Sequence, residues 1–360
     1  MNYYIHIPFC RSKCGYCVFY SEANAAGETV EAWLQECCRQ LRALPPDECE
    51  TIYIGGGTPT ILTIPQLEQL FQALKTLEPS GKTEISIEAN PETLTPEKVE
   101  LLRKHVTRLS TGVQSFSPAL RQTLGRNCTQ NALKNALKWI RQATFPHWNI
   151  DLIYAIPGQT PEMWQQELYH AAELGCDHIS CYNLTPEEGA LLASELIPNE
   201  DDSARMWQQT GEILSRSGIN RYEISNYARP GGECRHNMHV WRGGLLTGIG
   251  PAAAGFDGRR RMIQKESLKK WLAGDAPEID ELSIPARLNE IFAVNLRTVS
   301  GWTPELWEKV PFADSWTHRQ MIIRECMQKT SRKFFDISPE RITLSPDGLL
   351  FWNTIAESLI

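Results

Sequence analysis

The sequence contains no apolar run approaching the ~20 residues that a membrane-spanning helix needs, so no transmembrane segment is predicted. Its first residues, Met1–Pro8, include neither a basic stretch nor a long apolar stretch, which argues against a secretory signal. Basic residues do not dominate, because 36 Lys and Arg stand against 43 Asp and Glu, for a net charge of −7. This balance argues against nucleic-acid partners. The 360 residues carry no repeat and no low-complexity segment, and they suffice for about two globular domains.

Cysteine is plentiful, with eleven residues in all. Without an export signal, this number argues against a disulfide framework and predicts a reducing, cytoplasmic location. Three of the eleven, Cys10, Cys14 and Cys17, form a CxxxCxxC motif directly after the first predicted strand. Three thiolates on one tight loop can hold three corners of a [4Fe–4S] cluster, leaving one iron open to an outside ligand. A structural zinc site normally has four ligands, and no second pair follows at a suitable spacing.

Short β-branched or aromatic runs alternate with amphipathic helical patterns in the first half of the chain. Each strand is followed by a helix, which indicates a parallel sheet with right-handed crossovers. Periodicity alone leaves open whether this α/β sheet is doubly wound or forms a barrel or partial barrel. The predicted strands are Tyr3–Ile7, Thr51–Ile54, Glu84–Glu88, Leu109–Val113, Asn149–Ile153 and His178–Tyr182.

The pattern changes after Tyr182. A predicted helix at Asp202–Ser217 precedes a glycine-rich stretch, and the last ~80 residues contain two further helical patterns. The chain then reads Arg341–Leu344, a turn sequence at Ser345–Gly348, and Leu349–Trp352, which predicts a closing hairpin. We therefore expect three parts: a core over 1–183, an extension of it over 184–284, and a small α+β domain over 285–360.

Polar or glycine residues follow the predicted strands at their carboxyl ends. Since parallel strands end at one edge of a sheet, we expect these residues to surround the cysteine loop. A glycine triplet lets a ligand approach the backbone closely, and an arginine offers planar donors to a carboxylate. The residues are Gly55–Pro59, Glu88, Gln114, Asp151 and the nearby Arg126.

The CxxxCxxC motif, with an aromatic residue at Tyr16, resembles the signature of the radical SAM superfamily. The resemblance implies that S-adenosylmethionine (SAM) chelates the open iron and is cleaved to a 5′-deoxyadenosyl radical, with electrons from a flavodoxin or ferredoxin-type donor. It also implies that Gly56, Gly57 and Thr58 hold the SAM amino group, Arg126 its carboxylate, and Glu88 and Gln114 its ribose. Asp151 would line the nucleoside pocket, and the remaining SAM-binding candidates are Tyr4 and Tyr16.

A longer set of motifs resembles the HemW heme-chaperone family, which is related to oxygen-independent coproporphyrinogen III dehydrogenase (HemN). This resemblance implies a partial (βα)6 TIM-type barrel and a small α+β, winged-helix-like C-terminal domain. It implies a [4Fe–4S] cluster, SAM and heme as cofactors, and an acceptor protein, not identified by the sequence, that receives the heme. The motifs are Tyr4–Cys10, Ile54–Pro59, Glu88–Pro91, Gly112–Phe116, Asp151–Tyr154, Pro157–Thr160, Tyr222–Asn226 and Cys234–Asn237.

Two features favour the chaperone branch. Dehydrogenase-type sequences carry a fourth cysteine two residues after the third, where this sequence has Phe19. They also have a long N-terminal extension, whereas only nine residues precede Cys10 here. We therefore expect a heme chaperone that cleaves SAM reductively and lacks dehydrogenase activity. The alternatives are a coproporphyrinogen III dehydrogenase, which performs an oxidative decarboxylation, and a radical SAM enzyme that modifies heme.

The chaperones also carry an HNxxYW stretch connected with heme. It is matched by His236–Trp241, but Val240 replaces the tyrosine, and Ala254 lies in a segment that commonly contains a histidine. The axial ligand stays open among His236, His239 and Cys234. The complete set of heme candidates is His236, Asn237, His239, Trp241 and Cys234.

Overall fold

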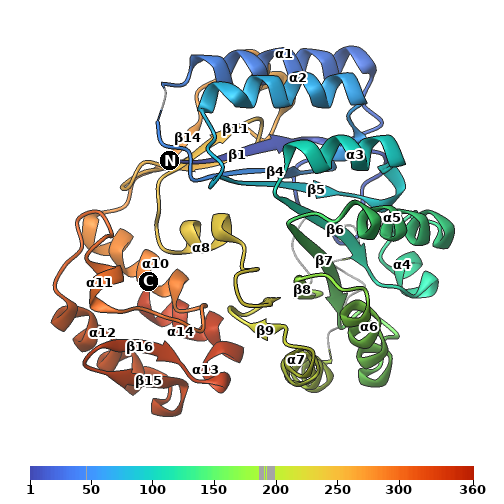
Figure 1. Cartoon of the computed structure of the whole chain (residues 1–360). Helices are drawn as coiled ribbons and strands as arrows, with labels where there is room; N and C mark the ends of the chain where they lie inside the picture. The colour runs from blue at the N-terminus through green and yellow to red at the C-terminus, as the bar shows by residue number, and fades with distance from the viewer. Residues whose placement is uncertain (46, 186–189, 191, 193–198) are drawn as a thin grey trace.

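Six parallel strands form the centre of the molecule in a computed structural model that describes residues 1–45, 47–185, 190, 192 and 199–360 (Figure 1). Consecutive strands are neighbours, and the outer two, β1 and β8, pair with other strands instead of closing a ring. The predicted α/β fold, a partial barrel, is confirmed, and all six strands lie where they were expected. They are β1 (Asn2–Ile7), β4 (Thr51–Gly56), β5 (Glu84–Ala89), β6 (Arg108–Gln114), β7 (His147–Tyr154) and β8 (His178–Asn183).

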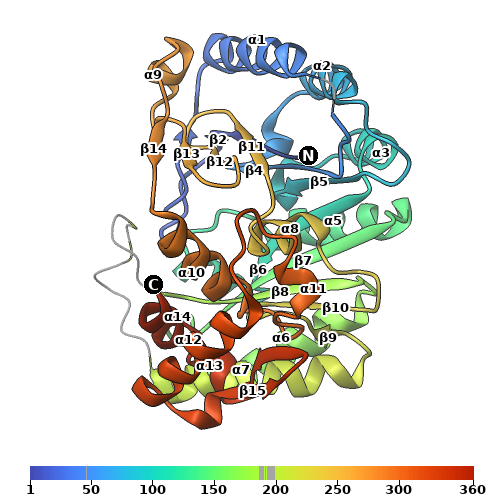
Figure 2. The ribbon, with the colours of Figure 1, turned by 90° about the vertical axis from the view of Figure 1, so that its left-hand side faces the viewer.

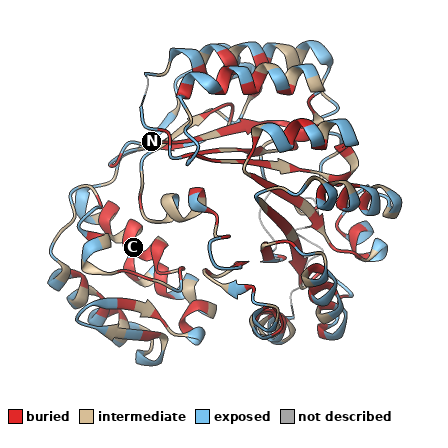
Figure 3. Cartoon of the chain, in the orientation of Figure 1, coloured by how far each residue is buried: buried red, intermediate tan, exposed pale blue. Residues whose placement is uncertain are grey.

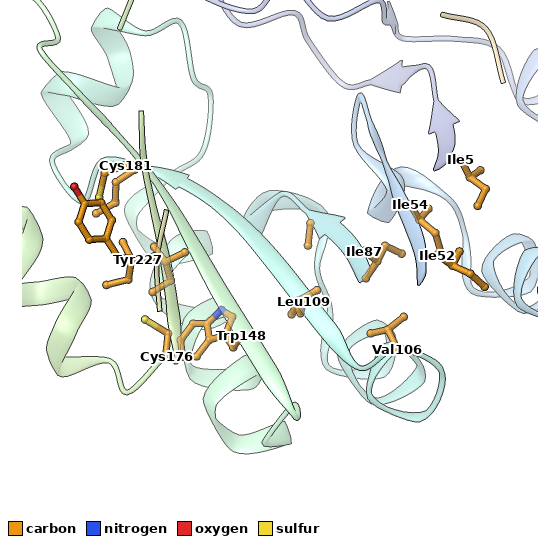
Figure 4. Close-up of a cluster of buried hydrophobic side chains, with 14 of the residues drawn as sticks. Ile5, Ile52, Ile54, Ile87, Val106, Leu109, Trp148, Cys176, Cys181 and Tyr227 are labelled. Atoms are coloured by element: carbon orange, nitrogen blue, oxygen red, sulfur yellow. The ribbon is translucent and has the colours of Figure 1, made fainter. Parts of the chain in front are cut away.

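The two faces of this sheet differ in chemistry, because successive side chains of a strand point to opposite faces. On β4, for example, Ile52 and Ile54 are completely buried in the apolar core, whereas Tyr53 between them lines a cavity inside the barrel. Ile87 and Leu109 continue the same apolar face, and Figure 4 shows part of this cluster. The outer face therefore packs against helices, and the inner face carries polar groups.

Helices cover the outer face of the sheet, and each one exposes its far side to solvent (Figure 3). Threonines that precede proline begin two of these helices: Thr95 and Thr160 accept hydrogen bonds from the amides of Lys98 and Met163. The helices of this part are α1 (Gly27–Ala43), α2 (Ile64–Leu74), α3 (Pro96–His105), α4 (Pro118–Thr123), α5 (Gln130–Ala143), α6 (Pro161–Glu173) and α7 (Glu200–Arg216). Short 3₁₀ turns are η1 (Pro59–Ile61), η2 (Lys75–Leu77) and η3 (Pro91–Thr93).

The following segment extends the same sheet at both edges. Strands β9 and β10 lie beyond β8, and β11 to β14 lie beyond β1, so this sheet has twelve strands in the described residues. Helix α8 contacts both β4 and α10, so it lies between the barrel and the C-terminal region (Figures 1 and 2). The elements are β9 (Asn220–Arg221), β10 (Asn226–Ala228), α8 (Arg235–Trp241), β11 (Leu246–Ile249), β12 (Ala254–Phe256), β13 (Arg261–Ile263), α9 (Leu268–Leu272) and β14 (Glu278–Asp280).

The C-terminal region has an aromatic core. The rings of Phe292, Trp302 and Trp307 have centroids 5.1–5.9 Å apart and pack stacked or edge-on. Across the described residues, no helix combines the length and the apolar character needed to cross a membrane. The elements of the region are α10 (Ile284–Asn295), α11 (Pro304–Trp307), α12 (Trp316–Lys329), η4 (Arg332–Phe334), β15 (Phe335–Ser338), β16 (Arg341–Leu344), α13 (Pro346–Leu350) and α14 (Trp352–Leu359).

The prediction of a closing hairpin is correct for its first strand and wrong for its second. Arg341–Leu344 is a strand, but it pairs with the preceding Phe335–Ser338, and Leu349–Trp352 is mostly helical. The sequence Ser345-Pro346 begins a helix instead of a turn, because the Ser345 hydroxyl accepts a 3.1 Å hydrogen bond from the amide of Gly348. The same serine-proline signal serves turns and helix starts, and here the helix it begins, α13, packs against η4, β16 and α14.

This corrected helix start can be tested. Replacing Ser345 with Ala removes the hydrogen bond to Gly348 and the bond that the hydroxyl donates to the Lys333 carbonyl. We expect the free energy of unfolding to fall by about 1–2 kcal/mol, measured by urea denaturation. Ser331→Ala is the matched control, because the Ser331 side chain makes no capping bond. Equal stability of the two variants would contradict the capping role.

Candidate functional site

A cavity of about 430 Å³ opens at the carboxyl ends of the barrel strands. Its lining combines the cysteine loop with the ends of β4 to β8, where the sequence analysis expected a site. Eight of the nine SAM-binding candidates line it: Tyr16, Gly56, Gly57, Thr58, Glu88, Gln114, Arg126 and Asp151. The ninth, Tyr4, does not line this cavity; its hydroxyl lies 3.0 Å from Nδ1 of His6 inside the barrel.

The three motif cysteines all line this cavity, which we call the cysteine cavity. Their loop is tied down by backbone bonds, since the amide of Gly15 donates to the Leu124 carbonyl and that of Cys17 to the Cys14 carbonyl. All three thiols are partly exposed. No group of three or more His, Cys, Asp or Glu side chains in the described residues is arranged to hold a single metal ion. Three thiols on one loop can hold three corners of a multi-iron cluster.

The glycine loop after β4 packs beneath the cysteine loop and has room for no side chain. A Cβ atom at Gly57 would lie 2.6 Å from the Phe9 carbonyl oxygen, and one at Gly56, where φ is +106°, would lie 2.7 Å from the His6 ring. The amides of Gly57 and Thr58 already donate to the carbonyls of Ile7 and Phe9. The loop therefore offers acceptors rather than amide donors, as a ligand's amino group requires.

Arg126 carries a buried donor without a partner. Its Nη2 donates to the Gly112 carbonyl at 2.7 Å and its Nη1 to the Cys14 Sγ at 3.7 Å, but its Nε has none among the described residues. A missing side chain at Gly112 makes this approach possible, because a Cβ there would lie 3.0 Å from Arg126 Nη2. A ligand carboxylate would satisfy the remaining donor.

Gln114 ends β6 in the left-handed region, with φ of +67°, at a shift in register against β7. A non-glycine residue in this region is strained, and such strain concentrates at functional positions. A Cβ atom at Gly112 would also lie 3.0 Å from Gln114 Nε2. The strand therefore distorts to present the Gln114 amide beside Arg126.

Two partly buried carboxyl groups face the cavity. Glu88 accepts bonds from the Tyr53 hydroxyl at 2.9 Å and the Gly56 amide at 3.1 Å, yet burial and then the charge of Asp151 raise its pKa to about 7. Burial also raises the pKa of Asp151, against hydrogen bonds from Ser110 and Asn149. The cavity thus holds two carboxyl groups whose raised pKa values favour the protonated, uncharged form.

The heme candidates lie at the opposite end of the barrel, on and beside α8. Cys234 is buried with its Sγ 3.6 Å from a Glu84 oxygen, and burial, followed by Glu84, raises its pKa to about 12. A thiol that keeps its proton is a poor iron ligand. Trp241 packs between Tyr222 and the Arg297 guanidinium, and Asn237 is partly exposed on α8.

His236 is held as a neutral ring of defined tautomer. Asn2 donates through Nδ2 to the Leu245 carbonyl, so its Oδ1 accepts the only hydroxyl proton of Thr51. The Thr51 oxygen must then accept from Nδ1 of His236, 2.7 Å away, which leaves Nε2 unprotonated. Burial lowers the pKa of His236 to about 4.

His239 is less buried than His236, with Nδ1 3.6 Å from a Glu50 oxygen. Its Nε2 is buried against Gly244 and has no partner among the described residues. Burial lowers its pKa as well. Both histidines therefore keep neutral imidazoles, the form that binds iron.

Two tyrosines of the cysteine cavity are not among the site residues predicted from the sequence. Tyr53 and Tyr182 line it from β4 and β8. The alternation of polar and apolar residues along each strand could have placed them on the inner face with Glu88.

Comparisons with known proteins agree with this arrangement. Residues 4–168 match the model of the radical SAM superfamily. The heme chaperone HemW of Lactococcus lactis is 31% identical over 99% of this chain and 96% of its own, and that of Escherichia coli is 36% identical over 71% and 70%. Among solved structures, coproporphyrinogen III oxidase (HemN) from Escherichia coli, a radical SAM enzyme, matches 99% of this chain and 89% of its own, with a TM-score of 0.83 and 22% identity.

The raised pKa of Glu88 makes a prediction about stability. Between pH 4.5 and about 7 the native carboxyl keeps a proton that the unfolded chain has lost, so the free energy of unfolding falls as pH rises through this window. We expect a loss on the order of 3 kcal/mol in the wild type, which Glu88→Gln removes. Urea denaturation at pH 4.5 and 8 measures it, with Glu212→Gln on the exposed side of α7 as the control. Parallel pH profiles for wild type and Glu88→Gln would refute the shift.

Proposed function

The chain belongs to the HemW heme chaperone family and contains a radical SAM domain, and from this premise we propose that it binds heme and passes it to an acceptor protein. The observation that carries the proposal is the 31% identity over 99% of the chain, because it includes α8 and the C-terminal region as well as the barrel. The fold that it shares with HemN supports the scaffold and leaves the reaction open.

We propose that the cysteine cavity holds a [4Fe–4S] cluster and SAM, with Cys10, Cys14 and Cys17 as the cluster ligands. Bound together, these groups supply one-electron radical chemistry. Acceptors of the glycine loop and Thr58 orient the SAM amino group, and the free Arg126 Nε binds its carboxylate. Glu88 and Gln114 accept from or donate to the ribose, while Asp151 and Tyr16 border the nucleoside.

The heme iron takes an imidazole from α8. His236 offers an unprotonated Nε2, fixed by the bond from Nδ1 to Thr51, as second-layer partners fix metal-binding histidines elsewhere. His239 offers a ring that is less buried than that of His236 and whose Nδ1 faces Glu50. Cys234 is disfavoured by its raised pKa.

An acidic electron carrier of the flavodoxin or ferredoxin type suits the mouth of the cysteine cavity. Arg11 and Lys13 are exposed on the cysteine loop and would attract such a partner. Phe19, 64% exposed beside them, adds an apolar contact. The eleven free cysteines support a reducing location such as the cytoplasm.

The cluster assignment predicts the effect of removing any one motif cysteine. Replacing Cys10, Cys14 or Cys17 with Ala should abolish iron incorporation and SAM cleavage while leaving the circular dichroism spectrum intact, because these partly exposed thiols add little to the core. Iron analysis after anaerobic reconstitution measures the loss. Cys326→Ala, in α12 far along the chain, is the control and should retain about four irons per chain. Unchanged iron in a motif variant would contradict the assignment.

Heme titration tests the function itself. The reconstituted protein should develop a Soret band with heme and form no protoporphyrinogen from coproporphyrinogen III in an anaerobic assay with SAM and reductant. If no Soret band develops, the chaperone proposal fails. If protoporphyrinogen forms, the protein is a dehydrogenase.

A further inference from the structure

A second cavity lies at the other end of the barrel from the cysteine cavity, between the barrel and the C-terminal region. Its volume is about 630 Å³, within the range of sites for cofactor-sized ligands. Thr51, the first residue of β4, lines it together with residues of α8 and with Val299 and Ser300. We call it the basic cavity.

Four arginines from separate parts of the chain converge on the basic cavity. They are Arg221 of β9, Arg235 and Arg242 at the two ends of α8, and Arg341 of β16. No ion pair with a carboxylate is found for any of the four within the described residues, although Glu50 and Glu233 line the same cavity. Glu50 instead faces His239. The cavity therefore has a surplus of positive charge that its own carboxylates do not neutralise.

Two of these arginines also carry buried donor atoms without a partner in the described residues. They are Nη1 of Arg221 and Nε of Arg242. A buried donor left without an acceptor costs about 1–3 kcal/mol. Arg221 is otherwise engaged, stacked 3.3 Å above Trp207 and bonded to the Tyr227 hydroxyl, whereas the part of the chain that the structure describes contains no such bond to the Arg242 side chain. An anionic ligand would satisfy both the charge and the open donors.

The rest of the lining indicates what the anion is attached to. Tyr222, Met238 and Val299 add aromatic and apolar surface between the arginines. Cationic side chains around such surface suit a large apolar body that bears separate carboxylates. A tetrapyrrole with two propionates has this chemistry.

We propose that the basic cavity binds the propionate carboxylates of the heme, through Arg242 and Arg341 above all, with the ring against Met238 and Val299; this inference rests on the heme-binding function proposed above. The cavity places the cargo beside His239 of α8, which lines it, while His236 does not. It also places the cargo far from the cluster. Thr51 and Gly56 are the two ends of β4, about 16 Å apart at ~3.3 Å per residue. Heme held there would lie out of reach of chemistry in the cysteine cavity, as a chaperone requires.

The experiment titrates heme into the reconstituted protein carrying Arg242→Gln, Arg341→Gln or both. Losing one charged hydrogen bond should weaken heme binding about tenfold per arginine, while iron content and SAM cleavage stay unchanged. Arg324→Gln, an exposed position on α12, is the matched control. If the wild type binds heme and the double variant binds it equally well, the inference falls while the proposed function stands. If the wild type binds no heme, both fall.

A second arm identifies the anion. Protoporphyrin IX and its dimethyl ester differ only in the propionate charges, so the wild type should bind the free acid about a hundredfold more tightly and the double variant should bind the two alike. Quenching of tryptophan fluorescence follows binding, with Trp241 on α8 nearest in sequence to the cavity residues. Equal wild-type affinity for acid and ester would overturn the carboxylate assignment.

Discussion

The architecture depends on one constraint, which is that a polar group buried inside the barrel costs free energy unless it has a hydrogen-bond partner. The inner faces of β7 and β8 meet this constraint with a directed hydrogen-bond chain. The Cys234 amide donates to the Tyr222 hydroxyl, which lies 2.8 Å from His178. Nδ1 of His178 lies 2.7 Å from Oδ1 of Asn149, whose Nδ2 donates to Asp151. The chain links the start of α8 to the cysteine cavity.

Disturbing this network lowers the free energy of unfolding, so the network holds its side chains in fixed positions. Breaking one member leaves its neighbours buried without partners, at about 1–3 kcal/mol each. Glu84 has the same role at the foot of the barrel, where it binds Arg108 and accepts from the amides of Arg235 and His236. Helix α8 is thus anchored to the strands through a carboxylate at its positive end. Its histidines keep a fixed position relative to β4.

The two ends of the barrel have separate chemistry as a result. At the carboxyl ends, close backbone approach at Gly57 and the strained Gln114 form the cysteine cavity. At the amino ends, α8 and the C-terminal region enclose the basic cavity. The length of the strands separates the two cavities, while the interior network connects the elements that line them.

The sequence by itself determined the six strands, their order, and the residues Glu88, Gln114 and Asp151 at the site, because strand periodicity and parallel pairing are local rules. The sequence could not show that Leu349–Trp352 is mostly helical, since Ser345-Pro346 suits a turn and a helix start equally. Nor could it gather Arg221, Arg242 and Arg341, which lie up to 120 residues apart in the chain. Only tertiary packing brings them to one cavity, because long-range contacts between the barrel and the C-terminal region leave no periodic trace in the sequence.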